Sequence, residues 1–95
     1  MEINGTIWMP EVEKKLILKH NIEPYEVEEM LGNEPHFRFV ENGHVEGENL
    51  YSAMGQSESG RYVIAFFIYK GEKLALILWA DMSDKERKAY DRAKR

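Results

Sequence analysis

The sequence contains no cysteine among its 95 residues. A disulfide framework, a zinc site built on thiolates and a cysteine nucleophile are therefore excluded. A small domain without such cross-links is typical of a reducing compartment. Residues 1–5 carry neither the basic start nor the apolar stretch of a secretory signal. We therefore expect a cytoplasmic protein.

Long apolar runs are also missing. A run such as residues 63–69 is far shorter than the roughly 20 residues that a membrane-spanning helix requires. Low-complexity tracts and internal repeats are absent as well. Because 43% of the residues are hydrophobic, the chain has enough apolar surface to fold, and its length suits one core of about 100 residues. We expect a single domain over residues 1–95 that makes no membrane contact.

Positive charge is scarce in the first part of the sequence. Residues 1–60 contain 12 acidic and 4 basic side chains, a net charge of -8, whereas residues 61–95 contain 5 acidic and 9 basic side chains, a net charge of +4. Only the C-terminal third could supply a basic surface for nucleic acid. We therefore expect any RNA association to depend only weakly on salt concentration.

Two helices are predicted near the N-terminus. Pro10 suits the first position of a helix, and the narrow apolar stripe after it predicts a short helix over residues 11–19. Pro24 starts a second pattern, in which apolar residues recur at i, i+3 and i+4 until Gly32. This pattern predicts a helix over residues 24–31.

Strands are predicted in the middle of the chain. Residues 36–41 alternate with a period of two, and the adjoining Asn42-Gly43 pair is a strong hairpin turn signal. Residues 50–56 form a second candidate strand. Residues 61–69 and 73–79 are almost continuously apolar and are joined by a short loop with a glycine, so we expect an antiparallel hairpin whose first strand is central and covered on both faces.

A third helix is predicted at the C-terminus. Ser83 and Glu86 have the spacing of a capping box, so the helix should begin at Asp84. The fold class expected is α+β, with an antiparallel sheet of about four strands, two N-terminal helices and one C-terminal helix. The residues on the apolar phase of these elements are expected in the core: Trp8, Val12, Leu16, Val27, Met30, Leu31, Val63, Ala65, Phe67, Leu76 and Leu78.

Several kinds of chemistry have no matching motif. The three histidines lack the spacing of a metal site, no Gly-x-Ser-x-Gly elbow occurs, and the glycines at 55 and 60 lack the lysine of a phosphate loop. Glu26, Glu28 and Glu29 cluster on the second helix, where charged side chains normally face solvent. We expect no metal and no cofactor.

A set of basic residues remains. Lys19 and His20 end the first helix, Arg61 opens a strand, and Arg87 lies near Tyr90 on the predicted last helix. Such a set could bind a phosphodiester, with arginine neutralising charge and His20 or Glu86 moving protons. The alternative is structural: Arg61 pairs with a neighbouring acid, Arg87 is merely solvated and Tyr90 anchors its helix.

Several segments, in this order and spacing, resemble the BrnT family of type II toxins. They are residues 19–22 (KHNI), 26–29 (EVEE), 51–57 (YSAMGQS), 60–61 (GR) and 81–87 (DMSDKER) with Tyr90. The resemblance covers roughly residues 7–90. It implies a RelE-like fold, a ribonuclease that cuts RNA without a metal, and a BrnA-type antitoxin partner. By the same resemblance, His20, Arg61, Glu86 and Arg87 would be catalytic, and Lys19 and Tyr90 would bind substrate.

Two positions depart from the family. Relatives carry an arginine where this chain has Ala80, and a basic residue where it has Leu50. Loss of one cationic donor can slow phosphoryl chemistry by about 10²-fold, so Ala80→Arg is expected to raise activity. Three hypotheses stay open: a weakened ribonuclease toxin, a catalytically inactive protein-binding module with the same fold, and an unrelated α+β domain, a homodimer through a strand edge.

Overall fold

The structure is a computed structural model that describes residues 1–43, 47–84, 88 and 92. In these residues it contains two α-helices and five strands, in the order β1 (Gly5–Trp8), α1 (Pro10–Lys15), α2 (Pro24–Leu31), β2 (His36–Glu41), β3 (Leu50–Gln56), β4 (Tyr62–Lys70) and β5 (Leu74–Met82). Helix α1 continues into a π-helical turn, η1 (Leu16–His20), and a 3-10 turn, η2 (Gly71–Lys73), joins β4 to β5. No helix among the described residues is long and apolar enough to span a membrane.

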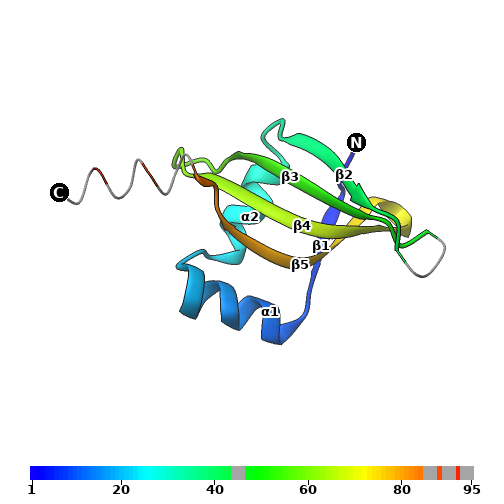
Figure 1. Cartoon of the computed structure of the whole chain (residues 1–95), viewed down its shortest axis with the longest axis horizontal. Coiled ribbons are helices and arrows are strands. Elements are labelled where there is room, and N and C mark those ends of the chain that lie inside the picture. Colours follow the sequence, from blue (N-terminus) through cyan, green and yellow to red (C-terminus); the bar gives the residue numbers. More distant parts are fainter. Residues whose placement is uncertain (44–46, 85–87, 89–91, 93–95) are drawn as a thin grey trace.

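The five strands form one mixed sheet in the order β1-β5-β4-β3-β2. Strand β1 is parallel to β5, and every other neighbouring pair is antiparallel. Helix α2 lies behind the sheet, against β3 and β4, while α1 and η1 run beside β5 past the end of β1 (Figure 1). The helices described therefore cover one face and one edge of the sheet and leave its other face open.

The predicted fold class was wrong in its strand count and pairing. The sheet has five strands and is mixed, because residues 5–8 add a parallel strand beside β5. Four residues are too few to show a period of two, and parallel pairing joins segments far apart in the chain, so no local pattern revealed β1. The third helix, predicted from Asp84, lies almost entirely outside the described residues.

The central hairpin is confirmed. Strands β4 and β5 are antiparallel neighbours, and β4 lies between β3 and β5. The expectation that this strand is covered on both faces was wrong. Val63, Ala65 and Phe67 are fully buried on the α2 side, whereas Ile64 and Phe66, on the other face, are only half-buried.

The core between α2 and the sheet contains most of the residues that were predicted to be buried. Seven of them are buried: Leu16, Val27, Met30, Leu31, Val63, Ala65 and Phe67. Trp8 and Val12 pack against the margin of this core. The predicted phase of β5 was wrong, because Ala75 and Ile77 are fully buried in place of Leu76 and Leu78.

A β-bulge in β5 reverses the facing of the residues that follow Leu78. Phe66 pairs with Trp79 and Phe67 with Ile77, so Leu78 is an extra residue without a partner in β4. One extra residue reverses the facing of the residues after it, and Ala80 therefore points into the core while Trp79 is 41% exposed on the open face. Both faces of this strand are apolar, so hydrophobic pattern alone could not assign its phase.

The first helix ends in an unusual way. Its last turn is π-helical, and Asn21 adopts a left-handed conformation with φ 54° and ψ 40°. The Ile22 N–H then donates to the Leu16 carbonyl at 3.0 Å, and Ile22 is fully buried. This turn places His20 beside β5, and π-helical turns are often found at functional sites.

The difference between the two sheet faces can be tested by truncation. We expect Phe67→Ala to lower the free energy of unfolding by about 3–5 kcal/mol, because it empties a fully buried site. Phe66→Ala, on the adjacent open-face position, should cost about half as much or less. Urea unfolding of both variants measures the contrast, and equal losses would contradict the one-sided core.

Candidate functional site

His20 and Asp81 form a polar pair at the edge of the sheet. His20 ends η1, and its Nδ1 lies 3.3 Å from Oδ1 of Asp81 on β5, whose side chain is only 12% exposed. The same oxygen accepts the Met82 N–H at 2.8 Å. The edge of the His20 ring also meets Trp79, with ring centroids 5.7 Å apart. Carboxylate and indole together hold the orientation of the imidazole.

This arrangement has a clear chemical consequence. A carboxylate at Nδ1 favours the tautomer in which Nδ1 carries the proton, which leaves Nε2 as the proton-accepting nitrogen. The pair therefore has the form of a general base with its positioning residue.

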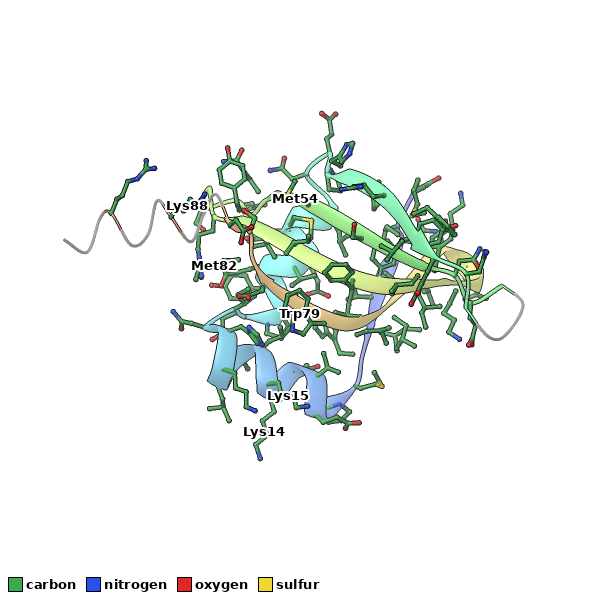
Figure 2. The ribbon with its side chains drawn as sticks, in the orientation of Figure 1. Lys14, Lys15, Met54, Trp79, Met82 and Lys88 are labelled. Carbon is green, nitrogen blue, oxygen red and sulfur yellow. The ribbon has the colours of Figure 1, made fainter. Side chains whose placement is uncertain are left out.

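A hollow of about 560 Å³ lies next to this pair on the open face of the sheet. Its lining is largely apolar and comes from three strands, with Met54 from β3, Ile64 and Phe66 from β4, and Trp79 and Asp81 from β5. Figure 2 shows Met54 and Trp79 on this side of the molecule. Trp79 also lines a smaller cavity of about 110 Å³ together with His20, so it borders both.

Arg61 is held by a buried acid. Its Nη1 donates to both carboxylate oxygens of Glu26, at 3.0 and 2.9 Å, and its Nη2 donates to the Asn21 carbonyl at 3.3 Å. Glu26 is 4% exposed, which corrects the expectation that the acids of the second helix face solvent. Its Oε1 also accepts the Glu23 N–H at 3.1 Å and so completes the N-terminal cap of α2.

The structure brings three of the predicted site residues together. Lys19 is exposed and directly precedes His20, and Arg61 reaches the carbonyl of the next residue, Asn21. The other predicted members, Glu86, Arg87 and Tyr90, lie outside the described residues. Sequence reasoning missed Asp81 and Trp79, because their contact with His20 joins segments about 60 residues apart and no local spacing marks it.

Ala80 and Leu50, where the sequence departs from the BrnT pattern, lie in different environments. Ala80 is fully buried and pairs with Ala65 in the centre of the covered face. Leu50 is half-buried and pairs with Ile68 on the open face. A guanidinium at position 80 would therefore enter the core between the sheet and the helices.

In the described part of the chain, no group of three or more histidine or carboxylate side chains could hold a metal ion. Comparison with known proteins adds no further guidance to the site. No family model matches the sequence, and no curated protein matches it. The resemblance to BrnT toxins therefore stays a prediction.

The Arg61–Glu26 pair makes a stability prediction. Arg61→Ala should lower the free energy of unfolding by about 2–3 kcal/mol, because it leaves the carboxylate of Glu26 buried without its partner. Lys73→Ala is the matched control, since Lys73 pairs with Glu2 at the surface and should cost less than about 1 kcal/mol. Urea unfolding compares the two, and equal costs would show that burial of Glu26 is unimportant.

Position 80 makes a second prediction. Ala80→Arg should destabilise the fold by at least about 3 kcal/mol, because it adds volume and charge to a filled core. Leu78→Arg, at the exposed bulge two residues away, is the control and should be tolerated. Thermal unfolding of both variants measures this, and a stable Ala80→Arg protein with raised activity would show that the core opens to admit the arginine.

Proposed function

We propose that this protein is a metal-independent endoribonuclease, a BrnT-like toxin of a type II toxin–antitoxin pair. The observation that carries the proposal is the His20–Asp81 pair at the border of the open-face hollow. A histidine oriented by a shielded carboxylate has the geometry of a general base. The hollow beside it offers apolar and aromatic surface on which a nucleotide base could stack.

The reaction that fits these groups is internal transesterification. Nε2 of His20 takes the proton of a ribose 2′-hydroxyl, whose oxygen attacks the adjacent phosphorus. The bond from phosphorus to the 5′-oxygen breaks, and a general acid protonates that leaving oxygen. The products are a 2′,3′-cyclic phosphate and a 5′-hydroxyl. Asp81 acts here as a positioning residue, and Glu86 is the proposed general acid.

Few cationic side chains are available to bind the scissile phosphate of the RNA. Lys19 lies next to the proposed base, and Arg87 and Tyr90 are further proposed contacts. Arg61 shares its charge with Glu26, so its catalytic contribution is reduced even though it lies near Asn21. Because Lys19 and the already paired Arg61 are the cationic side chains described near His20, we expect slow cleavage.

The proposed biological setting is cytoplasmic, with a BrnA-type antitoxin as the protein partner. Growth after induced expression of the chain, alone and together with a neighbouring antitoxin gene, tests this setting. Growth arrest that the neighbouring gene relieves is the expected result. Normal growth at full expression of the folded chain would count against a toxin.

A second candidate function is a catalytically inactive protein-binding module. The observation that favours it is the open apolar face, where Met54 is 42% and Trp79 is 41% exposed. Apolar surface of this kind often marks a protein-binding site. In this case the fold would persist and the His20–Asp81 pair would only hold η1 against β5.

RNA cleavage by the purified protein separates the two candidates. With EDTA present, the protein should cut a structured RNA and leave 2′,3′-cyclic phosphate ends. His20→Ala should reduce the rate by about 10²–10⁴-fold, the usual contribution of a general base, and added imidazole should restore part of it. Lys14→Ala, at an exposed site on α1, is the control and should cut normally.

Asp81→Asn tests the positioning role. An amide oxygen holds the Nδ1 proton less strongly than a carboxylate does, so the imidazole should lose its fixed orientation and kcat should fall with KM unchanged, whereas a purely structural role would change stability alone. If the parent cuts no RNA, and His20→Ala and Asp81→Asn only lower the unfolding temperature, the His20–Asp81 pair is structural. The binding-module candidate is then favoured.

A further inference from the structure

The open face of the sheet carries charge at its two sides and apolar residues between them. Directly paired residues of antiparallel neighbours share a face, so the register defines rows that cross the sheet from β2 to β5. One row is His36, Met54, Ile64 and Asp81, and the next is Arg38, Ser52, Phe66 and Trp79. These two rows thus begin with a histidine or an arginine and end with an acid or an exposed indole.

We infer that this face binds a second copy of the same chain, sheet against sheet, in a twofold-symmetric dimer. A twofold axis parallel to the strands places each row over the reverse of itself, because it exchanges β2 with β5 and β3 with β4. Met54 of the second copy then lies over Ile64, at the hollow. The aligned packing of two sheets, with strands within about 30° of each other, has this geometry.

Charge complementarity favours a second copy over an unrelated partner. His36 of one copy faces Asp81 of the other, near the exposed acid Asp84. Arg38, which is exposed, faces the ring of Trp79, where a cation–π contact forms. The remaining charges on the face do not oppose this arrangement, since Glu41 lies at its margin opposite Leu76, and Lys70 is paired with Glu48.

The area of the open face sets the expected affinity of the dimer. Four strands spaced about 4.8 Å apart and about seven residues long cover roughly 400 Å² of projected area per copy. This is smaller than the roughly 800 Å² per partner of a standard interface. A weak, reversible dimer is therefore expected, populated at high protein concentration.

This inference does not rest on ribonuclease activity, because association is measured without RNA. Sedimentation equilibrium of the full chain over a range of concentrations should show a monomer–dimer equilibrium. Ile64→Lys places an ammonium group in the middle of the contact and should weaken dimerisation by at least about 100-fold. Leu18→Lys, at a 72% exposed position on η1, is the matched control and should dimerise like the parent.

A second variant keeps the test informative if Ile64→Lys fails to fold. Arg38 is exposed at the edge strand β2, so Arg38→Glu should fold normally and weaken the dimer by about 10-fold through the lost contact with Trp79. Circular dichroism verifies the fold of each variant. A dimer of undiminished strength in Ile64→Lys and Arg38→Glu would assign association to another surface, such as the outer edge of β2.

The lack of native cysteine permits a direct contact test. Met54→Cys puts a single thiol near the twofold axis. Because packed sheets lie about 10 Å apart, too far for a direct disulfide, a bifunctional maleimide reagent should link two copies at concentrations where the parent associates. Leu18→Cys, exposed but away from this face, should cross-link far more slowly. Equal cross-linking of the two variants, or a parent that stays monomeric up to about 1 mM, would overturn the proposed dimer.

Discussion

The buried carboxylate of Glu26 connects three parts of the chain that the sequence separates. It accepts two hydrogen bonds from Arg61 at the start of β4, and it caps the first turn of its own helix α2. Arg61 extends the connection to the Asn21 carbonyl at the end of η1. A carboxylate removed from water needs this complete set of donors. The ion pair therefore contributes, together with the buried Leu16 and Ile22, to the position of η1 and of His20.

The bulge at Leu78 is the second constraint on the site. If β5 were regular and Leu78 had a partner in β4, Trp79 and Asp81 would point to the covered face and Ala80 to the open one, because side chains alternate along a strand. With the bulge, Trp79 and Asp81 reach both the hollow and the ring of His20. One residue in β5 therefore decides whether the proposed base has a positioning carboxylate.

RNA cleavage and dimerisation, the two proposals, both use the open face of the sheet. The hollow that would accept a nucleotide is the same surface that would contact a second copy, so RNA and a second copy would compete for it. Competition of this kind makes a ribonuclease less active as its own concentration rises. The apolar centre of the face and the charges at its two sides serve either occupant, which is why binding and cleavage need separate measurements.

The sequence alone determined the local structure. Pro10 and Pro24 marked helix starts, alternation and apolar runs marked β2 to β5, and the glycine loop predicted the central hairpin, because each signal lies within a few residues. It also singled out Lys19, His20 and Arg61. Tertiary structure decided the rest: the parallel strand β1, the bulge that sets the phase of β5, the burial of Glu26 and the pairing of His20 with Asp81. These features depend on contacts between segments far apart in the chain, and no local pattern of residues records such contacts.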